Sequence, residues 1–492
     1  MANSIIRSEL LETGNRLLFL TLVIATFLAF WKLGTKDIED WDEARQVITA
    51  VEMEHRGNYF DYFYADKIDT WNAKPPLLIW SMVGAYKLLG PSIFSSRLPS
   101  AVAAITFFFL VFSFVNLYRS KFFAFGVCLV LMSCRAVFEP HIGRTADFDA
   151  FLILFLAGFT YCFALHHDFK HRYAILGAGV FLGLAFYCKG TTSVFLLPGA
   201  VLYSLISGTI LSQLKSKTVW VGLAIYAMIA GSWFFISATY GASFNEAESI
   251  YGNTNSVNTM LINDTWDRFV GNAAFEDERG GKPFYFFVIL DILMNVWGYV
   301  FYLGVIIGIY SLVRSGKEWI GKILSKHNRL LTLSFCTVLT IMLLLEMSAT
   351  KMGWYYAPMF MFIAIIVMET VKYLAQINRV FRSISLLLFA GLLVRHFMFI
   401  DSLPQKTTPW LESNREAIAK SDKIYLIGDI RPSVYAQLKL INYHTHIGAP
   451  AAEEVTDDSN TLYVYKNTEN SEFISVNCNN QFCFGTKGLT GR

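Results

Sequence analysis

The sequence predicts an α-helical, polytopic membrane protein with about 11–13 spans and a small soluble α/β domain at its C-terminal end. Of the 492 residues, 54% are hydrophobic and only 16% are charged, whereas an average soluble domain carries about 25% charged residues. The apolar residues form runs long enough to cross a bilayer, and the chain from 401 onward loses that character. We therefore expect a transmembrane domain over 1–400 and a separate domain over 401–492.

The apolar runs have lengths near the ~20 residues that cross a bilayer as a helix. They lie at 17–34, 91–117, 121–138, 148–166, 173–187, 190–210, 217–239, 284–313, 330–346, 355–372 and 383–400. Another apolar run at 75–90 is shorter, and a span there would invert every later connection. We expect it to lie at the membrane interface, inside a first large loop over 35–90. A second large loop covers 240–283.

The connections between these runs alternate in charge. One set is short and basic, with Arg119 and Lys121, Lys170 to Arg172, Lys215 and Lys217, Arg314 to Arg329, and Lys372 to Arg382. The other set, which includes both large loops and the tail, is richer in Asp, Glu, Trp and Tyr. Because short cytoplasmic loops carry the excess of Lys and Arg, we expect a cytoplasmic N terminus, with the large loops and the tail outside.

The tail contains "KIYLIGDI", "YAQLKLINYHTHI" and "TLYVYKN", which combine β-branched residues and alternation with Pro, Gly and Asn punctuation. This pattern predicts a small α/β domain. Cys478 and Cys483 stand close together there and can pair in an oxidising compartment, so a disulfide and two free thiols are both open. The other five cysteines lie in or beside apolar runs, which favours core packing.

The first loop contains "WDEAR", which holds Trp41, Asp42, Glu43 and Arg45. Trp41 is a candidate for the aromatic lining of a site. After Asp42, a helical, amphipathic pattern is formed by Ala44, Val47, Ile48 and Val51. Asp42 is expected near a helix N terminus, where the helix dipole stabilises a carboxylate. One interpretation is a simple cap on an interfacial helix. The other is catalytic: Asp42 accepts a proton from an acceptor hydroxyl, Arg45 binds a phosphate oxygen, and Glu43 gives acidic support.

Lys74 lies in "WNAKPPLLIW", directly before two prolines and an apolar run. Pro76 holds Pro75 in an extended conformation, which fixes Lys74 at the mouth of that run. Lys74 is then either an interfacial side chain that snorkels toward water or an ammonium that pairs with a lipid-linked phosphate. Trp71 is a candidate for an aromatic lining of the same site.

A third segment, "GRTADFDAF", places Arg144, Asp147 and Asp149 at the outer end of a span. Ionisable residues there face protein or water rather than lipid. Asp147 and Asp149 form a D-x-D pattern, which is typical of metal or nucleotide-diphosphate sites but has little specificity alone. Structural pairing with Arg144 explains the same residues.

The later outer segments offer more cations and aromatic residues. In the 240–283 loop, Arg268 and Lys282 are candidates for phosphate contact. The segment "TKMGWYYAP" holds Lys351, Tyr355 and Tyr356 at an outer membrane edge. Lys351 is a further phosphate candidate, and the tyrosines belong either to an aromatic belt or to the lining of a site.

Several chemistries are not indicated. There is no P-loop, no G-x-G-x-x-G before a helix and no G-x-S-x-G elbow. A formal charge of +3 without a basic patch argues against nucleic acid, and the histidines lack metal-ligand spacing. We therefore predict no cofactor, no metal and no nucleic-acid partner; the lipid bilayer is a partner by composition.

At these residues the chain resembles the GT-C superfamily of polyprenyl-phosphate-sugar glycosyltransferases. It is most similar to the aminoarabinose transferase family and, more distantly, to protein O-mannosyltransferases. The resemblance rests on the order of "WDEAR", "KPPLLIW", "GRTADFDAF", "GKPFYFF" and "TKMGWYYAP", and it covers residues 15–375. It implies a GT-C fold and a membrane enzyme that uses a lipid-phosphate sugar.

The resemblance also implies roles for single residues. Asp42 matches the catalytic carboxylate, Arg45 the basic residue beside it, and Lys74 the lysine that contacts the donor phosphate. Asp149, with Asp147 as its rival, matches the acidic residue of the third motif. The basic residue of the second large loop could be Arg268, Arg279 or Lys282.

One departure from that family is informative. Relatives in the aminoarabinose group often have a carboxylate before the motif lysine and a histidine before the later Pro-aromatic motif, which together can hold zinc. Here those places are Ala73 and the stretch 280–282. The departure puts both a zinc site and an aminoarabinose substrate in doubt.

The expected function is inverting transfer of a sugar from a polyprenyl (undecaprenyl) phosphate to an envelope acceptor: lipid A, a protein or a glycan. The expected place is the outer, periplasmic face of a bacterial inner membrane. Lys74 and the loop cations would bind the phosphate, and Asp42 would remove the acceptor proton. The alternative from another class is a transporter or flippase of a lipid-linked intermediate, which would move its substrate without forming a bond.

Overall fold

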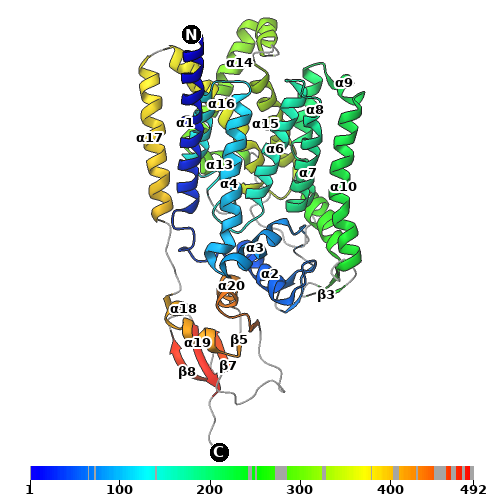
Figure 1. Ribbon diagram of the computed structural model, residues 1–492, viewed down its shortest axis with the longest axis vertical. Coiled ribbons are helices and arrows are strands. Elements are labelled where there is room, and N and C mark those ends of the chain that lie inside the picture. Colours follow the sequence, from blue (N-terminus) through cyan, green and yellow to red (C-terminus); the bar gives the residue numbers. More distant parts are fainter. Residues whose placement is uncertain are drawn as a thin grey trace, which may run out of the picture.

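The computed structural model shows a bundle of long helices with a smaller domain, formed by the tail, at one end (Figure 1). It describes residues 2–64, 66–70, 72, 74–138, 141–241, 247–249, 252–271, 285–323, 328–377, 379–402, 409–427, 430–447, 461–466, 473–478 and 482–487. The N terminus lies at the end of the bundle remote from the tail. The tail therefore sits beyond the end that carries the first loop.

Eight helical segments in the described chain are long and apolar enough to cross a membrane. They are α4 (Ile93–Asn116), α6 (Asp149–His167), α7 (Ala174–Lys189) with η1 (Gly190–Val194), α10 (Lys217–Tyr240), most of α14 (Val296–Ile323), α15 (Arg329–Met347), η6 (Gly353–Met359) with α16 (Phe360–Ile377), and most of α17 (Arg379–Ser402). Shorter apolar helices are the end of α1 (Ala2–Phe30), α3 (Leu77–Leu89), α5 (Lys121–Met132), α8 (Leu197–Ile206) and α13 (Tyr285–Met294). The predicted fold class, a helical polytopic membrane protein, is confirmed.

The predicted run 284–313 is not a single helix. It divides into α13 and α14 at Asn295, whose φ is 51°. Asn tolerates the left-handed region better than most residues, so an asparagine inside an otherwise apolar run marks the break. Similarly, the run 190–210 begins with the short helix η1 before α8.

The first large loop folds into two helices and a small hairpin at the tail end of the bundle (Figure 1). These are α2 (Asp42–Arg56), β1 (Phe63–Tyr64), β2 (Lys67–Ile68) and α3. Helix α2 ends at Gly57, which has the left-handed conformation (φ 64°) that commonly closes a helix. The apolar segment predicted to lie at the interface forms α3, a helix of 13 residues.

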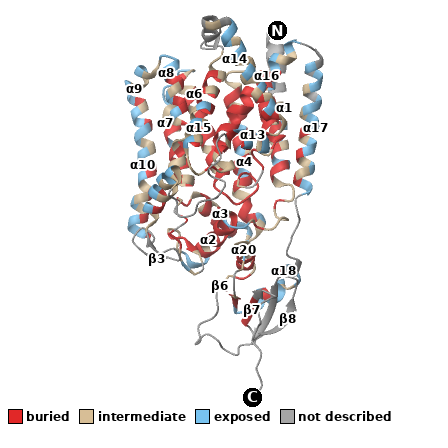
Figure 2. Cartoon of the chain, turned by 180° about the vertical axis from the view of Figure 1, so that it is seen from behind, coloured by how far each residue is buried: buried red, intermediate tan, exposed pale blue. Residues whose placement is uncertain are grey.

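The two predicted sets of connections lie at opposite ends of the bundle. The N terminus, α9 (Ile210–Leu214) and the end of α14 are at one end, while α2, α3 and β3 (Ala247–Ser249) are at the other (Figure 1). Buried residues gather in the middle of the bundle and in α2, whereas α10 and α17 are largely exposed at its edges (Figure 2). Exposed apolar helices of this kind suit a lipid environment. Which end faces the cytoplasm stays a prediction.

The tail forms the expected α/β domain. Its helices are α18 (Pro409–Ser413), α19 (Arg415–Lys420) and α20 (Pro432–Ile441). Its strands are β5 (Lys423–Ile427), β6 (Thr445–Ile447), β7 (Thr461–Lys466), β8 (Phe473–Cys478) and β9 (Phe482–Lys487), in the order β6-β5-β7-β9-β8. Strand β5 is parallel to β6 and β7, and β9 is antiparallel to β7 and β8. Cys478 lies opposite Cys483 in the β8–β9 ladder, and their disulfide stays a prediction.

Candidate active site

The N-terminal end of α2 carries the carboxylate that the sequence singles out. Asp42 is the first residue of α2, and its side chain is 47% exposed. Trp41, directly before it, is exposed and has a φ of 65°, a region that bulky L-residues rarely adopt. The chain turns sharply here and leaves Asp42 accessible to a ligand.

His141 lies beside Asp42 and was not among the predicted site residues. Its Nδ1 is 2.6 Å from an oxygen of Asp147 and 3.5 Å from an oxygen of Asp42. The imidazole stacks on Trp354 with ring centroids 3.8 Å apart. Burial alone would lower the pKa of His141, but the hydrogen bond and charge of Asp147, helped by Asp42, outweigh it and raise the pKa to about 9. The imidazole is then a cation between two carboxylates at neutral pH.

The same three side chains could also hold a divalent ion. Asp42, His141 and Asp147 each offer one ligand atom, and these atoms lie within 4.8 Å of one another. Carboxylate and imidazole ligands suit several divalent ions. A metal would, however, have to displace the short hydrogen bond between His141 and Asp147.

Asp149 lies at the start of α6 and is held by a lysine that the sequence reasoning missed. Both carboxylate oxygens of Asp149 are 2.6 Å from Nζ of Lys189, the last residue of α7. Both side chains are buried, and a buried pair of this kind is stable only when each charge keeps its partner. Lys189 also lies 5.6 Å from the ring centroid of Tyr355, so the pair borders the aromatic part of the site.

The predicted phosphate contacts partly converge on this region. Arg268 begins α12 (Arg268–Val270) and donates to the Tyr355 hydroxyl at 2.8 Å. Its other terminal nitrogen is 3.0 Å from a carboxylate oxygen of Asp264. Lys74 lies with Nζ 5.2 Å from the ring centroid of Phe148, the residue before Asp149. Lys189 and Arg268 thus share Tyr355, while Lys74 lies against Phe148, next to Asp149 in the chain.

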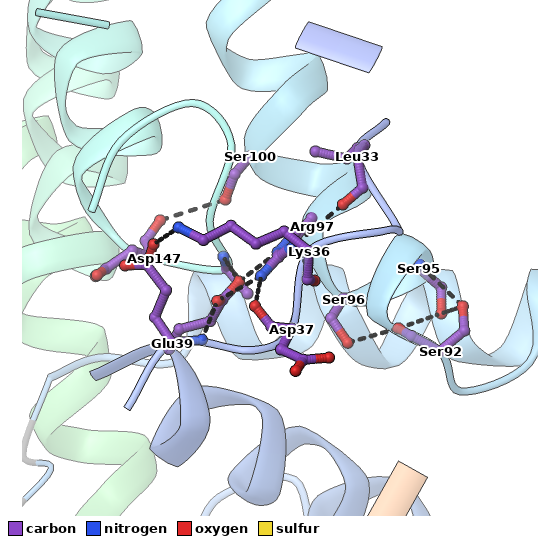
Figure 3. A network of polar contacts seen from close by, with 12 residues as sticks. Leu33, Lys36, Asp37, Glu39, Ser92, Ser95, Ser96, Arg97, Ser100 and Asp147 are labelled. Carbon is purple, nitrogen blue, oxygen red and sulfur yellow. Dashed lines mark hydrogen bonds and ion pairs between the residues drawn. The ribbon is translucent and has the colours of Figure 1, made fainter. Parts of the chain in front are cut away.

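Glu43 points away from the exposed carboxylate and anchors α2. Its oxygens accept from Nε and Nη2 of Arg97 at 2.6 and 2.8 Å and from the backbone N–H of Ala146 at 2.9 Å. Arg97, in α4, also donates to the carbonyls of Leu33, Lys36 and Asp37, as Figure 3 shows. Glu43 therefore ties the start of α2 to α4 and to the loop that carries Asp147.

Two further arginines of the predicted motifs, Arg45 and Arg144, bind protein groups outside this cluster. Arg45 donates to Asp69 at 2.6 Å and lies over the ring of Tyr64. Arg144 donates to the backbone carbonyls of Leu28 and Trp31 at the end of α1. Neither arrangement requires a ligand, because protein groups already surround each guanidinium.

The remaining predicted residues have varied surroundings. The Tyr356 hydroxyl donates to Glu346 at 3.1 Å, and Lys351 is buried in the turn before η6. Trp71, Lys282 and Arg279 lie outside the described residues. His141 and Lys189 are site residues that the sequence did not predict. Each lies at the end of an apolar run close to a predicted motif, and this placement is the signal by which they could have been found.

A family and a curated relative are similar to this chain in sequence. Residues 73–235 match the family described as dolichyl-phosphate-mannose-protein mannosyltransferase. YycA of Bacillus subtilis, which is named provisionally as a mannosyltransferase, is 24% identical over 225 residues. That match covers 44% of this chain and 31% of the relative, so it spans less than a third of the relative's length.

Solved structures resemble the chain over most of its length. The crystal structure of ArnT from Cupriavidus metallidurans bound to undecaprenyl phosphate is similar with a TM-score of 0.68 at 14% identity, covering 96% of this chain and 98% of that one. An oligosaccharyltransferase of Archaeoglobus fulgidus is similar with a TM-score of 0.55 at 12% identity, covering 89% and 64%. These likenesses confirm the predicted fold.

Proposed function

We propose that this chain, a GT-C glycosyltransferase of the mannosyltransferase and ArnT kind, moves a sugar from a polyprenyl phosphate to an envelope acceptor at the outer face of the membrane. The observation that carries the proposal is the pairing of two features at one end of the bundle. An accessible carboxylate, Asp42, lies beside a cationic histidine. Arg268 binds Tyr355, which also lies near the buried Lys189, and Lys74 lies against Phe148.

The reaction needs a base and a cationic cradle. The acceptor hydroxyl attacks the anomeric carbon, its proton passes to Asp42, and the bond from that carbon to the phosphate oxygen breaks as the new glycosidic bond forms. The configuration at the anomeric carbon inverts because the attack and the departure take place on opposite faces. Charge develops on the leaving phosphate, where Lys74 and Arg268 stabilise it more in the transition state than in the donor.

His141 supports the role of Asp42. Its imidazolium, held by Asp147, places a positive charge next to the Asp42 carboxylate and stacks on Trp354. The ring is therefore fixed in place beside the carboxylate that accepts the proton, which is 47% exposed. The exposed part of this carboxylate stays open to the acceptor.

An apolar groove supports a lipid-linked donor. The groove has a volume of about 730 Å³ and is lined by residues of α13, α14 and α15, including Phe286, Tyr302 and Met342. Phe286 packs on Tyr356 with ring centroids 6.0 Å apart, and Tyr356 is next to Tyr355, the partner of Arg268. An isoprenoid chain in this groove would bring its phosphate toward the cations.

The test starts from Asp42→Asn. We expect this variant to form less product by a factor on the order of 100 or more. Its binding of undecaprenyl phosphate should be unchanged, because the phosphate contacts are untouched. The product is defined by mass analysis of envelope glycolipids and glycoproteins from cells with and without the protein. Glu54→Gln, on the same helix, is the matched control and should transfer normally. Near-normal transfer by Asp42→Asn would overturn the role of Asp42.

Two alternative hypotheses, a flippase and a metal-dependent transferase, predict different results. A flippase would move the lipid-linked sugar across the membrane without forming a product bond. Mass analysis would then find no product that depends on the protein, and Asp42→Asn could not reduce it. A divalent ion on Asp42, His141 and Asp147 would make transfer sensitive to EDTA. We propose the metal-free reaction and expect transfer to be unchanged in EDTA, because the imidazolium of His141 already lies between the two carboxylates.

A further inference from the structure

The tail domain is not simply tethered to the bundle; one of its helices packs along α2. Lys439 of α20 forms an ion pair with Glu52 of α2, and the two side chains are 1% and 0% exposed. Nζ of Lys439 also donates to the Tyr443 carbonyl at 3.0 Å and lies 3.7 Å from Asp66. A lysine buried this completely is rare unless it is paired, so the pair is a specific feature of this interface.

Further contacts between the tail and the first loop lie at both ends of α2. At its start, the backbone N–H of Ser433 donates to Asp40 at 3.0 Å. At its end, His55 stacks on Tyr443 with ring centroids 3.7 Å apart. Beyond α2, His446 of β6 is 2.8 Å from Asp66 in the turn between β1 and β2. The tail therefore contacts the chain just before α2 and the C-terminal turns of α2.

The two anchors of α2 have different origins. The bundle holds the start of the helix through Glu43 and Arg97, whereas the tail holds its C-terminal half through Glu52 and Lys439. Asp42 is the first residue of the same rigid helix, so a tilt of α2 would move its carboxylate relative to His141. Misplacement by about 1 Å can cost about 100-fold in rate.

We propose that the tail domain is a positioning element of the active site, in which Lys439 acts through Glu52 and α2 to hold Asp42 against His141. The proposal rests on the proposed function, because it assigns Asp42 the role of the base. Lys439 is a positioning residue and touches no substrate. The tail is accordingly part of the catalytic unit rather than a separate binding module.

The experiment compares Lys439→Met with two other variants. Lys439→Met removes the ammonium from the buried Glu52 carboxylate and leaves it the Arg56 guanidinium, 2.6 Å from its other oxygen. Losing one of two partners is unfavourable for a buried charge. The double variant Lys439→Met with Glu52→Gln removes both charges and keeps similar volume. Lys420→Met is the matched control, because Lys420 is a tail lysine in an exposed pair with Glu416. Turnover is counted per undecaprenyl phosphate binding site, so that only folded protein contributes.

We expect Lys439→Met to lower kcat on the order of 100-fold. KM for the donor and undecaprenyl phosphate affinity should change less than about twofold, since the described side-chain contacts of Lys74 and Arg268 are with Phe148, Tyr355 and Asp264. The double variant should recover most of the loss, and Lys420→Met should match wild type. In an Asp42→Asn background, Lys439→Met should cause no further loss, because the two residues act on one step. A full kcat for Lys439→Met would overturn the proposal.

Hydrogen exchange separates this proposal from the proposed function. Lys439→Met should raise exchange in the amides of α2, whereas Lys420→Met should not. Unchanged exchange in α2, or raised exchange with wild-type turnover, would overturn the positioning role. If wild-type protein forms no product that Asp42→Asn loses, yet exchange in α2 rises as expected, the proposed function fails and the tail still holds α2.

Discussion

Arg97 is a buried cation of α4 whose contacts serve the first loop. It binds Glu43 through two nitrogens and donates to three backbone carbonyls between Leu33 and Asp37. Each guanidinium nitrogen therefore has an acceptor, which a buried arginine requires. The same carboxylate binds the backbone of Ala146, so one ion pair fixes the start of α2 against both α4 and the loop with Asp147.

We expect Arg97→Met to destabilise the protein by about 3–5 kcal/mol, because it leaves the buried Glu43 carboxylate unpaired. Combining it with Glu43→Gln should restore much of the stability. Thermal unfolding in detergent measures both effects. Arg415→Met is a suitable control, since Arg415 is 56% exposed in a pair with Glu412 and such pairs contribute little. Equal unfolding temperatures for Arg97→Met and Arg415→Met would contradict the anchoring role.

At this scale the sequence predicts some of the site and not the rest. Asp42 and Lys74 belong to short motifs whose order in the chain could be read directly, whereas Arg268 was one of three candidate cations in the second large loop. Arg97 is separated by 54 residues from Glu43, and Lys189 by 40 residues from Asp149. Their partners are decided by how helices pack, so local patterns do not identify them. Glu43 belongs to the same motif as Asp42, but its side chain is buried against Arg97.

Helix α2 is the element on which the site depends, and it is buried more fully than its pattern predicts. The amphipathic sequence indicated one apolar face, which packs on α3 and the bundle. The structure also buries polar residues of α2, among them Gln46, Thr49 and Glu52. The second covering comes from α20, and the tail sequence by itself contains no sign of that docking.

The contact between the tail and the β1–β2 turn should depend on pH through Asp66. Burial tends to raise the pKa of Asp66, but the hydrogen bond from His446 and the charges of Lys439 and Arg56 outweigh it and lower the pKa below 3.8. A group with a depressed pKa contributes stability that is present above its unfolded value and lost as pH falls through its folded value. The contact should therefore loosen in acid.

Limited proteolysis or hydrogen exchange of β1, β2 and α20 between pH 7 and pH 3 would measure this loosening. We expect wild type to lose protection toward the acid end of that range. Asp66→Asn should already be less protected at pH 7 and should change less with pH. Glu416→Gln, at an exposed tail position, should follow wild type. Identical pH profiles for Asp66→Asn and wild type would refute the role of Asp66.

Across the whole molecule, the predicted alternation of connections agrees with the two ends of the bundle. The runs of about 20 residues predicted nearly all of the long helices, since length and composition decide whether a helix can span. The predicted helix bounds were less accurate where the chain changes direction within an apolar run, as at Asn295. A single left-handed residue is enough to break a helix there. The described tail, the helices of the first large loop and β3 of the second large loop share one end of the bundle (Figure 1), as the charge pattern predicts.

That charge pattern predicts which side the shared end faces. The basic connections should stay in the cytoplasm, which puts α2, Asp42 and the tail outside. Lys420→Cys in α19 and Lys215→Cys beside α9 report on the two ends, since both lysines are exposed. The background carries Cys478→Ser and Cys483→Ser, so that the tail's own thiols do not react.

A membrane-impermeant maleimide added to cells with a permeabilised outer membrane should label the Lys420→Cys variant at once. The Lys215→Cys variant should be labelled only after the inner membrane is opened. Labelling in the reverse order would place Asp42 and the cations in the cytoplasm, and the acceptor would then have to be a cytoplasmic molecule. The outcome therefore decides whether Asp42 is accessible to acceptors outside the membrane or to acceptors in the cytoplasm.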